Sequence, residues 1–291
     1  MESQIIKARN IQKNYKDSSA LSGFDLDVYS GQIMGLIGPN GAGKSTFLQA
    51  ILGLVDTTGE LEVLGLSPKK DRHKLLNRVC SITDVAVMPR WMTVGQVLKY
   101  VDAVHPSFNL SKARDILSST DINRSSKIRT LSRGMVVQLH LAIVMAIDAE
   151  LLVLDEPTLG LDLAYRKRFY SQLIEDYFDG NKTIIISTHQ VEEIEGVLSH
   201  VVFLDKGKEV MSGSIDDLNQ RFLELRPKAE NLEKAKALNP LSIRTELGRP
   251  VYLYEGVNFK KLQDFGDVHP PAIADLFLAI MKKKTEEGET Q

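Results

Sequence analysis

Residues 38–45 constrain the fold of this chain more than any other part of the sequence. They read Gly-Pro-Asn-Gly-Ala-Gly-Lys-Ser and fit the pattern G-x-x-x-x-G-K-[ST]. The aliphatic run at residues 33–37 before the pattern is typical of a buried strand, and residues 46–52 after it are typical of a helix. A strand, a glycine-rich loop and a helix in this order predict a phosphate-binding loop within an α/β core.

The side chains and backbone of this loop suit the phosphates of a nucleoside triphosphate. Glycines let successive backbone N–H groups turn inward around the phosphates, and the positive end of the following helix adds to the field. We expect Lys44 to reach the β- and γ-phosphates, Ser45 to place its hydroxyl on Mg²⁺, and Thr46 to donate near the α-phosphate. The predicted phosphate-contacting residues are Gly38, Pro39, Asn40, Gly41, Ala42, Gly43, Lys44, Ser45 and Thr46.

Composition narrows the classes of protein to which the chain can belong. With 291 residues, 43% of them hydrophobic and 25% charged, it has the composition of an ordinary globular protein. A net charge of −2 disfavours non-specific binding of nucleic acid, and we expect no nucleic-acid partner. Cys80 is the single cysteine, which excludes an intrachain disulfide, and with no leader sequence at the start we expect a cytoplasmic protein. No apolar run approaches the roughly 18 residues of a membrane span, so a membrane role would need a partner chain.

Apolar patterns predict several parts around the phosphate-binding loop. Alternation at residues 24–28 and 59–65 predicts antiparallel strands, and helical spacing from about residue 67 to residue 147 predicts a helical insertion. Continuous aliphatic runs at residues 151–154 and 183–187 predict parallel strands that are covered on both faces. The expected fold is therefore an α/β P-loop NTPase core of mainly parallel sheet, with an antiparallel β subdomain and a helical insertion.

The pattern changes after Phe222. A charged helical stretch at residues 226–238, a strand-like run at 251–254 and a helix at 271–284 predict a small α+β extension. The expected division is a nucleotide-binding domain at residues 1–222, with its helical subdomain at about 85–150, and a C-terminal extension at residues 223–291.

Two acids, Asp155 and Glu156, follow the aliphatic strand at residues 151–154. Residues at the carboxyl end of a parallel strand project into the ligand crevice of the sheet. We expect Asp155 to hold Mg²⁺, directly or through water, and Glu156 to polarise the attacking water. The alternative is a strand end whose acids only meet solvent.

Residues 131–135 read Leu-Ser-Arg-Gly-Met and precede an apolar helix. Ser132 as the helix N-cap, followed by Gly134, would present a hydroxyl, backbone N–H groups and a positive helix end to an anion. Here the chain resembles the nucleotide-binding subunit of ABC transporters, whose signature is Leu-Ser-Gly-Gly-Gln. The resemblance implies that Ser132 and Gly134 face the γ-phosphate bound to a second subunit, so that a head-to-tail dimer encloses two ATP molecules.

Other family motifs follow in the same order along the chain. Tyr15 matches the aromatic residue that stacks on adenine, although a packing role is the alternative. Residues 159–162 match the loop that touches the opposite subunit, and His189 matches the switch histidine that contacts the γ-phosphate. The resemblance therefore implies ATP and Mg²⁺ as cofactors, with Lys44, Glu156 and His189 as the catalytic residues.

Two positions depart from the family pattern. Arg133 stands where the signature usually has glycine, which adds a positive charge beside the predicted anion site. Asp84 stands where the family carries a glutamine that contacts Mg²⁺ and its water, and we predict Asp84 as a metal-site residue. It would tighten Mg²⁺ binding, slow hydrolysis, or point elsewhere.

The segment after Asp84 carries the only tryptophan, Trp91, among apolar residues. In the family this stretch and the adjacent helices dock the coupling element of the membrane subunit, and Trp91 with Met88 and Met92 would suit such a groove. The alternative is that Trp91 closes the core of the helical insertion.

The resemblance covers about residues 5–222, and residues 271–278 loosely match the ends of single-domain bacterial exporters of the ABC-2 type. It implies an ATPase subunit that pairs with a copy of itself or a sister subunit and with separate membrane permease subunits, on the inner face of the cell membrane. ATP would close the dimer and hydrolysis would reopen it, while the C-terminal extension would regulate or stabilise the dimer. The alternatives are a soluble ABC ATPase that acts on ribosomes or DNA, and a weakly hydrolytic regulatory subunit, which Asp84 would favour.

Overall fold

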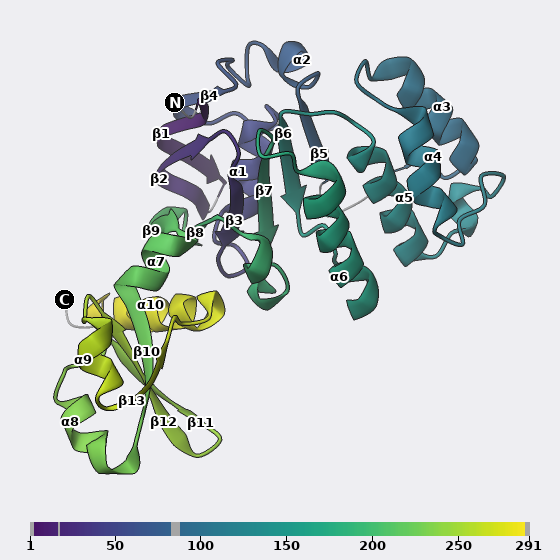
Figure 1. Ribbon diagram of the computed structural model, residues 1–291. Helices are drawn as coiled ribbons and strands as arrows, with labels where there is room; N and C mark the ends of the chain where they lie inside the picture. Colours follow the sequence, from purple (N-terminus) through teal and green to yellow (C-terminus); the bar gives the residue numbers. More distant parts are fainter. Residues whose placement is uncertain (1–2, 17, 83–87, 289–291) are drawn as a thin grey trace. The chain divides into compact units, whose positions relative to one another are not determined.

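A computed structural model of the chain describes residues 3–16, 18–82 and 88–288. The chain forms two compact units (Figure 1). One comprises Met1–His189 and Val202–Ser212, and the other comprises Gln190–Val201 and Gly213–Gln291. Among the described residues, no helix is long and apolar enough to cross a membrane.

The principal sheet has six strands in the order β5-β6-β7-β3-β8-β9. Its strands are β5 (Val79–Ile82), β6 (Leu151–Asp155), β7 (Thr183–Thr188), β3 (Ile33–Ile37), β8 (His200–Asp205) and β9 (Lys208–Ser214). The first four of these pair in parallel. Every residue of β3, β6 and β7 is buried, which explains why these strands appear in the sequence as continuous aliphatic runs.

A second sheet of three antiparallel strands, in the order β2-β1-β4, contributes to a hydrophobic core that also includes residues of α1. It contains β1 (Gln4–Tyr15), β2 (Ser18–Tyr29) and β4 (Thr58–Val63). Phe24 of β2 packs edge-on against Phe47 of helix α1 (Lys44–Ile51), with 4.7 Å between the ring centroids. This packing fixes α1, and with it the loop that α1 follows, against the antiparallel sheet.

The insertion between β5 and β6 is helical, as the spacing of its apolar residues predicts. It contains α3 (Val94–Val104), α4 (Leu110–Ser118), the 3₁₀ turn η1 (Ile128–Thr130) and α5 (Arg133–Met145), and the shorter α2 (Arg72–Leu75) precedes β5. Figure 1 shows α3, α4 and α5 side by side beyond the β5 edge of the sheet. Side-chain caps begin the three longer helices, because Thr93, Asn109 and Ser132 each accept a hydrogen bond from a backbone N–H of the first turn.

The crossover between β6 and β7 is α6 (Leu163–Gln172), which continues as a π-helical turn, η2 (Leu173–Tyr177). Two 3₁₀ turns, η3 (Val191–Glu193) and η4 (Glu195–Val197), follow β7. The predicted α/β core, with its mainly parallel sheet, antiparallel β subdomain and helical insertion, is confirmed.

The second unit contains a four-stranded antiparallel sheet in the order β11-β12-β10-β13. Besides η3 and η4, its elements are α7 (Ile215–Arg221), β10 (Phe222–Pro227), η5 (Ala229–Asn231), α8 (Leu232–Lys236), β11 (Ser242–Glu246), β12 (Arg249–Glu255), α9 (Phe259–Gln263), β13 (Gly266–His269) and α10 (Ile273–Gly288). Leu223, Leu225, Tyr252 and Tyr254 of the sheet form one core with Ala235 of α8 and Leu262 of α9. The extension is therefore α+β, as expected.

One prediction for this unit is wrong. The stretch at residues 226–238 is not one helix, because Arg226 and Pro227 end strand β10 and the helix α8 covers only Leu232–Lys236. The strand is held by long-range pairing with β12 and β13, and the charged residues that follow it suggested a longer helix than the chain forms.

Candidate functional site

The phosphate-binding loop runs from the end of β3 to the start of α1 and depends on its glycines. Gly41 and Gly43 have φ angles of +81° and +110°, in the left-handed region that favours glycine. A Cβ atom on Gly43 would lie 2.4 Å from the carbonyl oxygen of Ala20, and one on Gly38 would lie 2.2 Å from that of Leu204. No side chain fits at either place, so glycine is required for the path of the loop.

Lys44 is the first residue of α1, and its side chain is held beneath the loop. Only 7% of the residue is exposed. Its Nζ donates to the carbonyl oxygens of Gly38, at 2.6 Å, and Pro39, at 3.2 Å. Burial lowers the pKa of Lys44, while the negative charges of Glu156 and Asp155 oppose that shift. The ammonium group is thus kept in the loop by backbone carbonyls and lies in the field of two acids.

The two acids take different positions at the carboxyl edge of the sheet. Asp155 ends β6, is 5% exposed, and accepts a hydrogen bond from the hydroxyl of Ser187 in the neighbouring strand β7. Glu156 follows with φ at +47°, which is unusual for a residue other than glycine, and its N–H donates to the carbonyl oxygen of Ser187 at 3.1 Å. Such backbone strain costs about 1–3 kcal/mol and is concentrated at functional sites. The sequence contained no signal for it.

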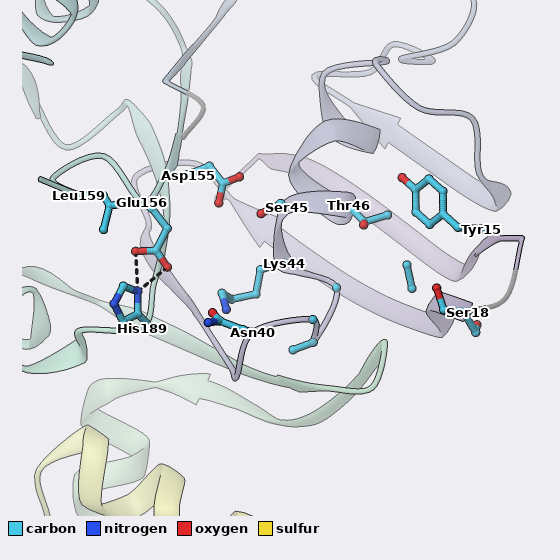
Figure 2. A pocket seen from close by; sticks show the side chains of 15 residues that line it. Tyr15, Ser18, Asn40, Lys44, Ser45, Thr46, Asp155, Glu156, Leu159 and His189 are labelled. Carbon is cyan, nitrogen blue, oxygen red and sulfur yellow. Dashed lines mark hydrogen bonds and ion pairs between the residues drawn. The ribbon is translucent and has the colours of Figure 1, made fainter. Parts of the chain in front are cut away.

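His189 lies beside Glu156, as Figure 2 shows. Its Nδ1 atom is 2.9 Å from both carboxylate oxygens of Glu156. The His189 side chain is 44% exposed and that of Glu156 is 18% exposed. The structure therefore pairs the predicted base with the predicted switch histidine at the wall of one pocket.

These groups line a cavity of about 720 Å³. Its lining consists of Tyr15, Ser18, Ser19, Ala20, Asn40, Gly41, Ala42, Gly43, Lys44, Ser45, Thr46, Asp155, Glu156, Leu159 and His189. In Figure 2, Tyr15 lies toward one end of this cavity and the pair of Glu156 and His189 toward the other. Gly38 and Pro39 form the turn without lining the cavity.

Sequence reasoning missed some lining residues. Ser18, Ser19 and Ala20 begin strand β2, opposite the end of β1 where Tyr15 lies. Tyr15 pairs with Ser18 between β1 and β2, and the sequence patterns did not predict this pairing. Ser187 was missed because its contact with Asp155 arises only from the pairing of β6 with β7.

The signature segment lies apart from this cavity lining. Ser132 is the N-cap of α5, as predicted, and its Oγ accepts from the N–H of Met135 at 3.2 Å. Neither Ser132 nor Gly134 lines the cavity. Trp91 is 72% exposed, so the alternative in which it closes the core of the insertion is wrong. Asp84 lies outside the described residues.

The cavity combines the groups that phosphoryl chemistry needs. A lysine and two hydroxyls, from Ser45 and Thr46, follow a loop shaped by glycines, and two acids at the end of β6 line the same cavity. An aromatic ring that is 45% exposed, that of Tyr15, offers a stacking surface for a base. The arrangement can bind a nucleotide polyphosphate and place a carboxylate near its phosphates.

Comparisons with known proteins agree with this chemistry. The family model described as ABC transporter matches residues 21–159. The chain is 30% identical over 267 residues to the Nod factor export ATP-binding protein I of Cupriavidus metallidurans, and the match covers 86% of each chain. It is also 30% identical over 235 residues to the bacitracin transport ATP-binding protein BcrA of Bacillus licheniformis, covering 79% of this chain and 77% of the other.

Solved structures agree on the fold. The structure of an ATP binding subunit of an ABC transporter superimposes with a TM-score of 0.68 at 22% identity, covering 74% of this chain and 91% of that chain. A bacterial Atm1-family ABC exporter with ATP bound superimposes with a TM-score of 0.64 at 20% identity, covering 75% of this chain and 40% of that chain.

Proposed function

Because this chain belongs to the family of ABC transporter ATP-binding subunits, we propose that it powers an exporter by hydrolysing ATP in the cavity beside Lys44. As a member of that family it binds ATP and is an ATPase. The observation that carries the proposal is the single cavity that joins the phosphate-binding loop to Asp155, Glu156 and His189. Export is inferred from relatives whose names describe Nod factor export and bacitracin transport.

The residues at the carboxyl edge of the sheet fit a bound Mg²⁺ ion. Ser45 offers a hydroxyl and Asp155 a carboxylate, both of which are oxygen ligands that Mg²⁺ prefers. No three His, Cys, Asp or Glu side chains form a metal cluster within the part of the chain that the structure describes. This fits an ion that takes its remaining ligands from phosphate and water. The predicted contribution of Asp84 stays a prediction.

Glu156 and His189 are placed to act on the attacking water. A carboxylate at the cavity wall can accept a proton from that water. His189, at 2.9 Å from both carboxylate oxygens, would orient the carboxylate and contact the γ-phosphate. Lys44 would stabilise the charge that develops on the phosphoryl group.

A second subunit would complete the site. Since Ser132 and Gly134 lie outside the cavity lining of their own chain, we infer that they close the cavity of a partner, either a copy of this chain or a sister subunit. ATP would close this head-to-tail dimer and hydrolysis would reopen it. The nucleotide-binding domain at residues 1–222 would do this work, and the extension at residues 223–291 would regulate or stabilise the dimer.

The chain would work at the inner face of the cell membrane, in the cytoplasm, bound to integral permease subunits. The exposed Trp91 and its neighbour Met92, which lie just before α3, form an apolar contact suited to such a partner.

Glu156→Gln tests the proposed function. The variant should bind ATP as the parent does, but its turnover should fall by at least about a hundredfold, because amide replaces the base. Size-exclusion chromatography with light scattering should detect an ATP-dependent dimer at millimolar ATP and Mg²⁺. Glu62→Gln, which changes an exposed acid of β4, is the matched control and should behave as the parent. Turnover at the parent rate in Glu156→Gln would refute the catalytic assignment.

A further inference from the structure

The side chain of Arg133 covers Gly160, in the loop that follows Glu156. A Cβ atom placed on Gly160 would lie 3.2 Å from Nε, 3.5 Å from Cζ and 3.6 Å from Cδ of Arg133. Gly160 has a φ angle of +86°, so this backbone position favours glycine and presents bare peptide to its neighbour. The guanidinium group therefore lies in the space that a side chain at position 160 would occupy.

The same loop is tied to Glu156 by its backbone. The N–H of Leu159 donates to the carbonyl oxygen of Glu156 at 3.2 Å, and the N–H of Leu161 donates to that of Thr158 at 3.1 Å. Leu159 lines the cavity beside Glu156 (Figure 2). A shift of Gly160 would thus be transmitted through one short turn to the residue that carries the carboxylate.

The far end of the loop rests on the start of α5. Leu161 is 6% exposed, and a Cβ atom on Gly134 would lie 3.9 Å from its Cδ2. The carbonyl oxygen of Leu161 accepts from Nε of Arg166 at 2.9 Å. The signature segment and α6 therefore hold the loop together, and Arg133 is the signature residue that lies against Gly160.

No acid among the described residues is a partner of Arg133. Among the residues that the structure describes, none forms a hydrogen bond or ion pair with its guanidinium group. Its removal would leave no acid of the described residues unpaired, and we argue its contribution from packing and from the planar shape of the group. A guanidinium plane can stack on a peptide, which an ammonium group cannot do.

We propose that Arg133 is a positioning residue for hydrolysis: stacked on Gly160, it fixes the loop at residues 159–162 and thereby the carboxylate of Glu156 in the same subunit. The inference rests on the proposed role of Glu156 as the base. In the proposed dimer, Ser132, next to Arg133, faces the partner's ATP. Contact with that ATP would therefore be linked, through Arg133, to the position of Glu156 in the same subunit as Ser132.

Arg133→Gln tests this inference beside Arg129→Gln, which removes an exposed arginine from the turn just before the signature segment. Arg133→Gln should lower kcat roughly tenfold and leave the half-saturating ATP concentration within about twofold, because misplacing a catalytic group affects chemistry more than binding. Arg133→Lys should remain as slow as Arg133→Gln, and Arg129→Gln should match the parent. The ATP-dependent dimer should still form in Glu156→Gln/Arg133→Gln.

Three results would overturn the inference. A parent kcat in Arg133→Gln would remove any role in hydrolysis, and full recovery in Arg133→Lys would assign the role to charge instead of stacking. Loss of the dimer in Glu156→Gln/Arg133→Gln, but not in Glu156→Gln/Arg129→Gln, would make Arg133 a closing contact. Failure of the proposed function is distinguishable, because it would appear in Glu156→Gln alone as absent dimerisation or parent turnover.

Discussion

Two buried carboxylates, Asp155 in the principal sheet and Glu224 in the C-terminal sheet, are held in opposite ways. Asp155 is 5% exposed and accepts its hydrogen bond from a neutral hydroxyl, that of Ser187. Glu224 is 2% exposed, and the guanidinium group of Arg244 contacts both of its carboxylate oxygens. His269 lies 3.8 Å from Glu224, and Arg244 also reaches Asp275 of α10 at 3.0 Å.

This difference indicates that Asp155 serves to bind a ligand, whereas Glu224 serves to stabilise the fold. Burying a carboxylate is costly unless a cation or several donors compensate it. Glu224 receives that compensation from its own sheet, so its pairing stabilises the fold. Asp155 has a neutral partner and a place beside Ser45, which leaves its negative charge for a cation that arrives with the nucleotide. The first region should therefore respond to substitution mainly in activity, and the second mainly in stability.

Lys44→Ala gives the largest expected effect and acts on the first region. ATP binding should be lost and turnover should fall by at least about a hundredfold, because one preorganised charge near the phosphates is removed. The free energy of unfolding should not decrease, since burial lowers the pKa of Lys44 and its desolvation opposes folding. Titration with a fluorescent ATP analogue and urea unfolding followed by circular dichroism measure the two quantities.

The exposed Lys70 supplies the matched control for this variant, and Lys70→Ala should match the parent in both assays. Normal ATP binding in Lys44→Ala would remove the phosphate-binding role of the loop. A large loss of stability in Lys44→Ala would contradict the difference between the two regions, because Lys44 would then stabilise the fold as Arg244 does.

Arg244→Met acts on the second region and should cost about 2 kcal/mol of unfolding free energy. Removing one partner of a fully buried pair costs about 3–5 kcal/mol, and the value here is lower because the Arg244 side chain is 35% exposed. Glu224→Gln/Arg244→Met should recover part of the loss, because the amide carries no charge. Arg249→Met, on the exposed end of β12, is the control. A loss in Arg249→Met equal to that in Arg244→Met would contradict a specific role for the pair.

Local patterns in the sequence predicted most of the first region. The glycines and Lys44 lie within one short stretch of sequence, and β3, β6 and β7 are mostly continuous aliphatic runs, so no knowledge of distant contacts was needed. Strand β10 was missed because its identity depends on pairing with β12 and β13, while the charged residues after it favoured a helix. The ion pair between Glu224 and Arg244 joins two strands of that sheet, and local sequence patterns did not predict it either.

Within the candidate site, the sequence predicted residue types but not their partners. Asp155, Glu156 and His189 were expected from motifs, whereas the hydroxyl of Ser187 on Asp155 comes from strand pairing. The left-handed backbone of Glu156 comes from the turn that follows β6. Likewise, the contact of Arg133 with Gly160 brings the first residue of α5 to a loop after β6, and no sequence spacing predicts that contact.

Ser187→Ala gives the smallest expected effect and tests whether Asp155 serves a ligand, which Glu224 does not. Loss of the hydroxyl should cost about 1–2 kcal/mol of stability, because the buried carboxyl group of Asp155 would lose its hydrogen-bond donor. If Asp155 serves a Mg²⁺ ion, the half-saturating Mg²⁺ concentration for ATP hydrolysis should rise about threefold, while kcat at saturating Mg²⁺ changes by less than about twofold, since this change in metal affinity is below about 1 kcal/mol.

Thr183→Val is the control, because Thr183 is buried at the other end of the same strand, where its hydroxyl donates to the carbonyl oxygen of Tyr29 at 3.4 Å. It should lose a comparable free energy of unfolding without any change in Mg²⁺ dependence. If Ser187→Ala lowered stability and left the Mg²⁺ curve of the parent unchanged, the hydroxyl would serve only to compensate a buried acid. Asp155 would then resemble Glu224 in having only a structural role, and the proposed difference between the two carboxylates would be wrong.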